Sequence, residues 1–575
     1  MRYRRTRIPG TGPPTPPELV LHAHPRSDLR VGGDGRVTGG LGAAALDREL
    51  RDAGMVLRPV FGGRARLREW AGRRVPGAPC AAPDLSRYYR IVPAADGRFP
   101  EDPASLNEQL RRHHAVDAAY LRPPTVLPVL PRTEAEVLPV AGATATEDFS
   151  PLQGYLNPAS EGGIDARYAW TIAGGDGEGT IIADVERAWR MTHEDLDMAG
   201  DDLMGGIPVD DVEARNHGTA VAGILAATHD GRGVMGISPG ADVKGMAVTG
   251  DFIWSCANAI REAAERLRPG DIILIEQMAP GPRVLLGDAD EQFGYIPVEW
   301  WPLDLDAIQY ASSRGIIVVE AAGNGSQDLD EDVYEVGALA FGDHWQNPLR
   351  GDGRDTGAIL VGAGAPPPGT GDHDWGPDRS RLHWSNWGTR VDVQAWGQAV
   401  TTTGGYGSGP DALRPTWDED GWYTSRFSGT SSAAPMVAGA LACIQGMLRA
   451  HGRPPLMPEE ARDLLRETGS PQEHEADRVS RWIGPRPDLR SMVERVFDDA
   501  KARRPRSKDM ATVKITIETD GEITQIEAPA TAERPLKVKS QTNGTPEEPS
   551  DLIGLIGLIG KLAYEYSQRK GPARV

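Results

Sequence analysis

The segment that decides the fold of this 575-residue chain is FSGTSSAAPMVAGALA, residues 427–442. Gly429 frees the backbone immediately before Ser431, and the alanine-rich run that follows predicts a helix. A hydroxyl at the N-terminus of a helix lies at the positive end of the helix dipole, which favours negative charge developing nearby. An ordinary serine N-cap, which is very common, fits the same pattern.

Three other segments carry polar side chains beside apolar runs. TIIAD ends in Asp184, NHGTAVAGILAA has His217 at the start of a small-residue helix, and VVEAAGNG sets Asn324 between two glycines. The carboxylate could belong to a site at the carboxyl edge of a sheet, the imidazole could act as a base, and the amide could donate to an oxyanion. Taken singly, a turn or capping aspartate, a packing histidine and a turn asparagine are the commoner explanations.

The region from 151 to 498 predicts an α/β domain. Near-continuous apolar runs alternate with helical stretches, which indicates a mostly parallel sheet with helices on both faces. The runs are residues 180–183, 271–275, 315–319 and 357–361.

Residues 18–123 predict a separate, small α+β domain. Four strands and two helices follow one another in the order β-α-β-β-α-β, which is the ferredoxin-like split βαβ unit. The strands are expected at 18–22, 55–61, 88–92 and 117–121, and the helices at 43–54 and 104–110.

The remaining segments predict connections and extensions. Residues 1–17 are rich in arginine and proline and are expected to be disordered, and residues 124–150 read as an extended linker. Residues 499–575 form a C-terminal extension with a hairpin around Asp520-Gly521, a polar stretch, and a short hydrophobic helix at LIGLIGLIG.

Composition excludes several classes of protein. The chain has 62 basic and 82 acidic residues, a net charge of −20, which argues against a general nucleic-acid binder. Its 3 cysteines cannot build a disulfide scaffold. No run approaches the ~20 apolar residues of a membrane-spanning helix. The basic N-terminus lacks the apolar region of a signal peptide, so the cytoplasm is the expected location, with export by another route left open.

The segments in the chain order Asp184, His217, Asn324, Ser431 resemble the subtilisin-like serine peptidases, the subtilase family. The motifs HGTAVAG and SGTSSAAP are highly specific, and the resemblance covers roughly 350 residues. It implies a subtilisin-like fold and a serine endopeptidase that hydrolyses peptide bonds through an acyl-enzyme.

The resemblance also implies a role for each of these residues. Ser431 would be the nucleophile and His217 the general base, then acid. Asp184 would orient His217 and stabilise its charged form, and Asn324 would donate to the oxyanion. The roles make chemical sense because a serine hydroxyl is a weak nucleophile until a positioned base takes its proton.

The chain departs from the family pattern at two of these places. Asp184 is followed by Val185-Glu186, where the family usually has a small hydroxyl residue and glycine, so the polar environment of Asp184 is expected to differ from that in the family. Met436 stands where a histidine is common, and we interpret it as a packing change.

Two segments are expected to bind substrate. One aligns with the family segment that pairs with the substrate backbone, and the other follows the strand that leads to Asn324. Glu320 could place an acid near the S1 pocket, although a satisfied structural carboxylate is the favoured interpretation. The expected substrate-binding residues are Glu276, Gln277, Met278, Glu320, Ala321, Ala322 and Gly323.

The position of the N-terminal domain resembles that of a subtilase propeptide, which would act as an intramolecular chaperone and inhibitor and be removed by autoprocessing. No cofactor is required by the chemistry. Structural Ca²⁺ could bind the acidic patches at 328–332 and 418–420, although solvated acidic loops are the simpler interpretation. The expected partners are a polypeptide substrate and the N-terminal domain itself. LIGLIGLIG could bind a partner or a membrane surface.

Two other functions remain open from the sequence. The cleft could hold a peptide without cutting it, as a catalytically silent scaffold, although all three triad positions are filled. An esterase or transacylase could use the same nucleophile.

Overall fold

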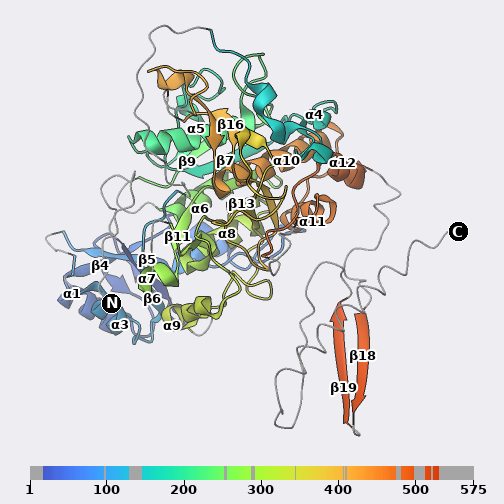
Figure 1. Cartoon of the computed structure of the whole chain (residues 1–575). Coiled ribbons are helices and arrows are strands. Elements are labelled where there is room, and N and C mark those ends of the chain that lie inside the picture. Colours follow the sequence, from blue (N-terminus) through green and yellow to red (C-terminus); the bar gives the residue numbers. More distant parts are fainter. Residues whose placement is uncertain are drawn as a thin grey trace. The chain divides into compact units, whose positions relative to one another are not determined.

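The computed structural model has two compact units, residues 1–496 and 497–575 (Figure 1). It describes residues 17–95, 99–100, 102–127, 145–250, 255–286, 292–342, 345–405, 407, 411–473 and 481–497, and the backbone of 512–519 and 522–529.

The N-terminal domain is a four-stranded antiparallel sheet with the order β4-β5-β1-β6. This is the predicted ferredoxin-like topology. Alternate residues of the strands are buried against the helices, because side chains on a strand alternate between the two faces. Its elements are β1 (Glu18–Ala23), β2 (Arg30–Val31), β3 (Val37–Thr38), α1 (Ala43–Asp52), β4 (Met55–Pro59), α2 (Arg64–Trp70), β5 (Tyr88–Pro93), α3 (Pro103–Leu110) and β6 (Val116–Arg122).

The larger domain is built on a seven-stranded sheet with the order β15-β14-β13-β10-β7-β9-β8, and its paired neighbours are all parallel. The apolar runs become strands buried on both faces, as the sequence predicts. The strands are β7 (Ile181–Glu186), β8 (Leu203–Gly205), β9 (Asp242–Ala247), β10 (Ile272–Ile275), β13 (Ile317–Ala321), β14 (Ile359–Gly364) and β15 (Val393–Trp396).

Helices cover both faces of this sheet. On one face, α6 (Cys256–Arg266) and α8 (Pro302–Ser313) share a core with residues such as Val185 and Ile275. On the other, α10 (Thr430–Ala450) packs against β13, β14 and β15, and α5 (Val212–Ala226) packs against α10. The further elements are α4 (Ala166–Ala169), β11 (Met278–Pro280), α7 (Pro282–Leu286), β12 (Tyr295–Pro297), α9 (Gly337–Phe341), β16 (Val400–Thr403), β17 (Tyr423–Phe427), α11 (Pro458–Thr468) and α12 (Leu489–Phe497).

The helix α10 is long and apolar enough to cross a membrane. All of its apolar window is buried inside the protein, which is the ordinary state of a core helix. The small residues of the SGTSSAAP segment let it pack closely against the sheet.

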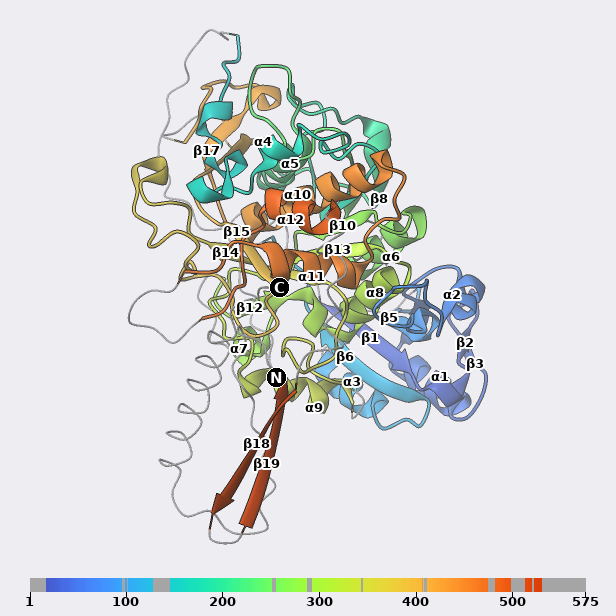
Figure 2. The same ribbon diagram turned by 90° about the vertical axis from the view of Figure 1, so that its right-hand side faces the viewer.

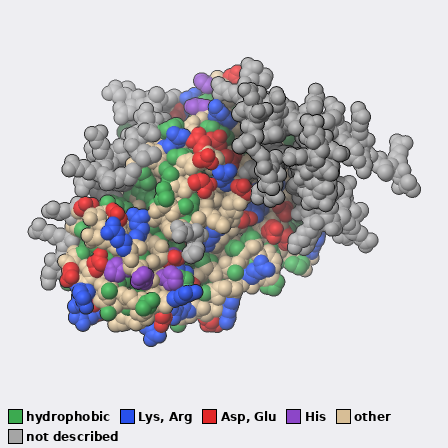
Figure 3. All heavy atoms as spheres, turned by 90° about the horizontal axis from the view of Figure 1, so that it is seen from below, with side chains coloured by type: hydrophobic (Ala, Val, Ile, Leu, Met, Phe, Trp, Pro, Cys, Tyr) green, Lys and Arg blue, Asp and Glu red, His purple; other side chains and the backbone are tan. Residues whose placement is uncertain are grey.

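The N-terminal domain packs against α8, as the two views in Figures 1 and 2 agree. The Tyr88 hydroxyl lies 2.8 Å from Asp306 Oδ2, and Val20, Tyr88 and Tyr120 enter the same hydrophobic core as α6 and α8. On the face seen in Figure 3, basic and acidic side chains of the described residues are interspersed.

The second unit contains an antiparallel hairpin of β18 (Thr512–Thr519) and β19 (Glu522–Pro529). Thr519 pairs with Glu522, and the predicted turn residues Asp520 and Gly521 lie outside the described residues. The LIGLIGLIG segment and the N-terminal residues 1–16 lie outside the described residues.

Candidate active site

His217 lies in the second turn of α5. Asp211 caps that helix, because its Oδ1 accepts a hydrogen bond of 3.0 Å from the Ala214 amide. The helix begins at Val212, five residues before His217, and not at His217 as we predicted. The capping aspartate moves the start upstream and leaves the imidazole on the side of the helix that faces β7.

The carboxylate that meets His217 is Glu186 and not the predicted Asp184. Glu186 Oε2 lies 2.5 Å from His217 Nδ1, and both side chains are buried. The Arg187 amide donates to Glu186 Oε1 over 2.8 Å, which fixes the carboxylate. Asp184 Oδ2 instead accepts a hydrogen bond of 2.8 Å from Trp189 Nε1.

The strand explains this correction. Asp184 and Glu186 are two residues apart, so they lie on the same face of β7. Glu186 is the last residue of the strand, at the carboxyl edge where sites of parallel sheets form, whereas Asp184 lies one strand period further inside. Two carboxylates on one face, with the second at the strand end, are the signal by which the sequence could have indicated Glu186.

Gly218 allows α5 to come close enough for this contact. A Cβ at Gly218 would lie 2.2 Å from the Ala188 carbonyl oxygen and 2.8 Å from Glu186 Cγ. Any larger residue would push the helix away from the end of β7, so the glycine that follows His217 sets the distance between His217 and Glu186.

Ser431 is the second residue of α10, and Gly429 before the helix has a φ of +104°, a conformation that favours glycine. The neighbouring Ser432 has a structural role, because its hydroxyl donates to the Trp396 carbonyl over 2.8 Å. The Ser431 hydroxyl interacts with the carboxyl of Glu276. Phe427, at the end of β17, packs edge-on against the His217 ring, with the ring centroids 5.5 Å apart. This contact connects the segment that precedes Ser431 to α5.

Asn324 is held with its amide turned in a fixed direction. Its Oδ1 accepts hydrogen bonds from the Thr430 amide (2.9 Å) and the Thr430 hydroxyl (3.1 Å) at the start of α10. Its Nδ2 therefore points the other way, where it donates to Gln292 Oε1 over 3.3 Å. A side-chain amide fixed in this way beside a nucleophile can serve as a preorganised donor.

The two predicted substrate-binding segments lie next to each other. Ala321 ends β13, Ala322 and Gly323 follow it, and a Cβ at Gly323 would lie 3.6 Å from Met278 Cβ. Gln277 is buried between them and the N-terminal part of the chain, where its Oε1 accepts a hydrogen bond of 2.9 Å from the Thr125 hydroxyl.

Glu320 is a correction to the predicted substrate-binding set. It is in register with Ile275 and Val185, whose side chains enter the core below α6 and α8, on the face opposite to His217. There its Oε1 accepts a hydrogen bond of 3.3 Å from the Glu299 amide, and Arg390 acts on it as a neighbouring positive charge. It is a structural carboxylate.

Asp184, Glu186 and Glu276 form a cluster of three buried carboxyl groups next to Ser431. Burial, and next the charge of Glu186, raises the pKa of Asp184 well above its usual range. Burial, and next Glu186, likewise raises the pKa of Glu276. Both shifts favour the neutral form of Asp184 and Glu276, whereas Glu186 faces His217.

Side chains of both acidic patches are engaged by other residues. Among the described residues there is no group of three or more His, Cys, Asp or Glu side chains that could hold a metal. In the first patch Asp330 accepts hydrogen bonds from the backbone and hydroxyl of Thr389. In the second, Asp420 is paired with Arg190, and Glu419 with Arg215.

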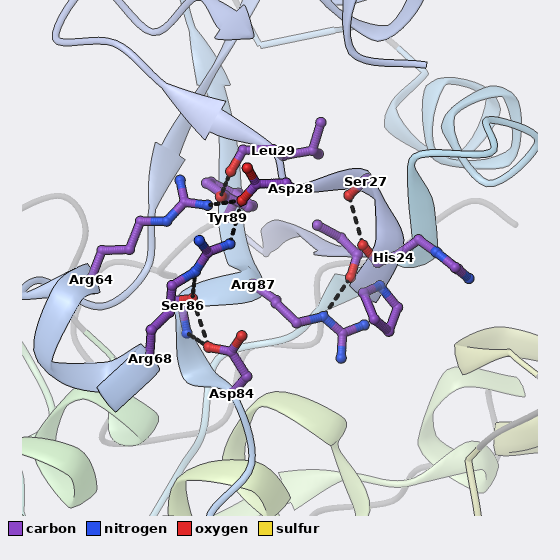
Figure 4. A pocket seen from close by; sticks show the side chains of 12 residues that line it. His24, Ser27, Asp28, Leu29, Arg64, Arg68, Asp84, Ser86, Arg87 and Tyr89 are labelled. Carbon is purple, nitrogen blue, oxygen red and sulfur yellow. Dashed lines mark hydrogen bonds and ion pairs between the residues drawn. The ribbon is translucent and has the colours of Figure 1, made fainter. Parts of the chain in front are cut away.

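A pocket of about 140 Å³ lies in the N-terminal domain, apart from these residues (Figure 4). Arg64, Arg68 and Arg87 line it, but their charges have partners. Arg68 points at Asp28 and at Ser86, and Arg87 binds Asp117 and the Ala23 carbonyl. We assign no ligand to it.

The model of the subtilase family, peptidase S8, matches residues 193–484, half of the chain, and spans His217, Asn324 and Ser431. The chain belongs to the subtilase family. The match begins at His193, so it does not include β7 with Glu186.

This subtilase is therefore a serine peptidase with the subtilisin-like fold. It is 28% identical to thermitase from Thermoactinomyces vulgaris over 300 residues, which cover 50% of this chain and 81% of thermitase. It is 26% identical to a calcium-dependent protease from Trichormus variabilis, covering 55% of this chain and 46% of that protein. Fervidolysin from Fervidobacterium pennivorans, a keratinolytic enzyme, matches with a TM-score of 0.47 and 16% identity, over 90% of this chain and 68% of fervidolysin.

Proposed function

We propose that this subtilase hydrolyses peptide bonds with Ser431 as nucleophile, His217 as base, Glu186 as the carboxylate partner of His217, and Asn324 as oxyanion donor. The observation that carries the proposal is the 2.5 Å contact between His217 Nδ1 and Glu186 Oε2 in a buried pair. A carboxylate at Nδ1 leaves Nε2 as the nitrogen that can accept a proton.

The steps follow from these positions. Nε2 of His217 takes the proton of Ser431 as Oγ bonds to the carbonyl carbon of the peptide, and the imidazolium is stabilised by Glu186. The carbonyl oxygen becomes an oxyanion that accepts a hydrogen bond from Asn324. His217 returns the proton to the leaving amine, and water then releases the acyl group by the same route in reverse.

The decisive test is a pair of serine variants. Ser431→Ala should abolish casein hydrolysis and labelling by a fluorophosphonate probe, and should keep the thermal unfolding profile. Ser432→Ala removes a buried hydrogen bond of about 1 kcal/mol and should leave the labelling in place. Labelling that persists in Ser431→Ala would exclude Ser431 as nucleophile. If the protein were a catalytically silent scaffold, neither Ser431→Ala nor Ser432→Ala would be labelled.

We further propose that the chain cuts its own linker. Val126 forms an antiparallel bridge with Met278 through two backbone hydrogen bonds of 2.9 Å. This is the pairing by which an extended peptide adds a strand in a protease groove. The Leu127 side chain packs against Ala188 and Ala214, beside the residues that hold His217. These contacts of Val126 and Leu127 support our proposal that the start of the linker occupies the substrate-binding position.

Contacts at the two ends of the linker support a narrower range for the cleavage site. On its C-terminal side, the Glu147 carbonyl and the Phe149 amide bond to the backbone of Gly233, so the chain is anchored there. The new N-terminus should fall after Leu127 and before Glu147. N-terminal sequencing of the wild-type fragment tests this expectation, with Ser431→Ala as the uncut control; a cut before Thr125 would contradict it.

The N-terminal domain would remain bound as an inhibitor after the cut. Arg122 donates two hydrogen bonds of 2.7 Å to the buried Asp304 on α8. Asn258 of α6 donates to the Val60 carbonyl over 2.7 Å and accepts from Arg90 over 3.3 Å. These contacts do not involve the linker, so they persist when it is cut. Adding residues 1–127 to the cleaved enzyme should inhibit it.

A further inference from the structure

Glu276 lies where the ends of three parallel strands meet. It follows β10 directly, and its amide donates to the Val185 carbonyl over 3.2 Å. The register pairs Leu274 with Asp184, so the next residue on that face, Glu276, lies beside Glu186. It therefore faces the side of α5 and α10 and not the side of α6 and α8.

The carboxyl of Glu276 is buried without a basic partner. The side chain is 0% exposed, and neither oxygen makes a hydrogen bond of regular geometry within the described part of the chain. The groups that act on its charge are Asp184 and Glu186 from β7 and Ser431 from α10. His217 faces the same cluster from α5 through Glu186, and β13 presents the apolar Ala321. Burial raises the pKa of Glu276 well above that of an ordinary glutamic acid.

The Ser431 hydroxyl carries a single hydrogen, and in the proposed mechanism this hydrogen passes to His217. The hydroxyl interacts with the Glu276 carboxyl. His217 Nε2, the nitrogen that must accept the hydrogen in catalysis, is buried and has no hydrogen-bond partner among the described residues. A neutral carboxylic acid can donate to Ser431 Oγ, whereas a carboxylate can only accept.

We propose that Glu276 is a positioning residue for the nucleophile and works only as a neutral acid. As an acid it donates its hydrogen to Ser431 Oγ and leaves the Ser431 hydrogen free to point at His217 Nε2. As a carboxylate it accepts the Ser431 hydrogen itself, turns the hydroxyl away from His217, and adds a negative charge next to the developing oxyanion. Ionisation of Glu276 thus switches the nucleophile off as the pH rises. The inference rests on the proposed function of Ser431 and His217.

The test is the pH dependence of Ser431 reactivity in the full chain after processing. The rate constant for labelling by a fluorophosphonate is measured from about pH 6 to about pH 10, and kcat/KM for a fluorogenic peptide is measured alongside. In the wild type both should fall above the Glu276 transition, by up to about tenfold per pH unit. In Glu276→Gln, whose amide donates at every pH, the alkaline fall should disappear from a profile normalised at neutral pH.

Two further variants keep the test decisive. Asp184→Asn removes a buried carboxyl from the same cluster without touching Ser431 and should retain the alkaline fall. Glu276→Leu, which cannot accept the hydroxyl hydrogen, should also lose the fall if Glu276→Gln does not fold. An alkaline fall in folded Glu276→Gln or Glu276→Leu equal to that of the wild type overturns the inference. A wild type that is not labelled at any pH instead overturns the proposed function.

Discussion

The side chain of Glu186 is one methylene group longer than that of Asp184, the residue that we predicted to contact His217. The longer side chain reaches His217 from the last position of β7, and Gly218 leaves the space through which it does so. At this scale the fit is set by one glycine and one CH₂ group, and each can be changed by itself.

Glu186→Gln should lower kcat/KM by about 10⁴-fold, because an amide no longer fixes the imidazole tautomer or stabilises its charged form. Glu186→Asp should fall between this variant and the wild type, because the shorter carboxylate points correctly but does not reach Nδ1. Asp184→Asn is the matched control, since Asp184 bonds to Trp189 and not to His217. Its kcat/KM at neutral pH should change by less than about tenfold. Peptide hydrolysis decides the assignment: a larger loss in Asp184→Asn than in Glu186→Gln would restore the original prediction.

Asn324→Asp should lower kcat by about 10²- to 10³-fold with little change in KM. The substitution keeps the oxygen that accepts from Thr430, so the start of α10 stays in place, but it replaces the amide donor with a charge that repels an oxyanion. Steady-state kinetics and a thermal melt measure the two effects separately. An unchanged kcat in the folded variant would remove Asn324 from the mechanism.

At the scale of elements, the loop after β7 contains two buried titratable groups whose effects on stability oppose each other. Asp195 accepts hydrogen bonds from the Thr228 hydroxyl and the Val234 amide, and His193 Nε2 lies 2.8 Å from the Trp422 carbonyl. Burial raises the pKa of Asp195 to about 7 and lowers that of His193 to about 4. Between about pH 4 and about pH 7, these shifts favour a neutral Asp195 and a neutral His193 in the loop between β7 and α5.

The pH dependence of stability tests this arrangement. As the pH rises from about 4 to about 7, the unfolded chain releases the Asp195 proton that the folded chain retains, so this group lowers the free energy of unfolding. Over about pH 4 to 6.5, His193 raises it, because the unfolded chain still binds a proton that the folded chain excludes. The contributions of these two groups to the wild type should therefore nearly cancel, and Asp195→Asn should gain about 3 kcal/mol relative to the wild type across that range. Denaturant titrations at a series of pH values measure the free energy of unfolding of both proteins. Parallel plots of this free energy against pH for the wild type and Asp195→Asn would contradict the prediction.

The elements could be predicted from the sequence because their signals are local: apolar runs for the parallel strands, and the β-α-β-β-α-β order for the N-terminal sheet. The predicted start of α5 was wrong, because the helix is capped by Asp211 and the prediction placed its start at the more conspicuous HGT motif. The structural interpretation favoured for Glu320 could not be decided from the sequence, because the face that its side chain occupies depends on the register between β10 and β13, which no local pattern contains. The choice between Asp184 and Glu186 depended on how closely a distant helix approaches the strand.

At the scale of the whole first unit, Arg122 and Asp304 join the N-terminal domain to the catalytic domain through a buried ion pair. Arg122→Met leaves Asp304 buried without its partner, at a cost of about 3–5 kcal/mol. The inhibition constant of the added N-terminal fragment should rise by about 100-fold or more. Arg112→Ala breaks an exposed pair with Glu108 in the same domain and should change it less than about threefold. Equal inhibition by both variants would show that the Arg122 pair does not hold the fragment.

Only three residues separate the end of β6 at Arg122 from the bridge between Val126 and Met278. In the uncut chain, this short tether and the linker together would hold the proposed inhibitory strand beside the cleft at an effective concentration in the millimolar range, whatever the amount of protein. A cut beyond Leu127 removes the covalent tie to the catalytic domain, and occupancy of the cleft then obeys mass action. Dilution alone should therefore raise the specific activity of the processed enzyme, and each molecule freed in this way could release others, so that activation would begin with a lag and then accelerate.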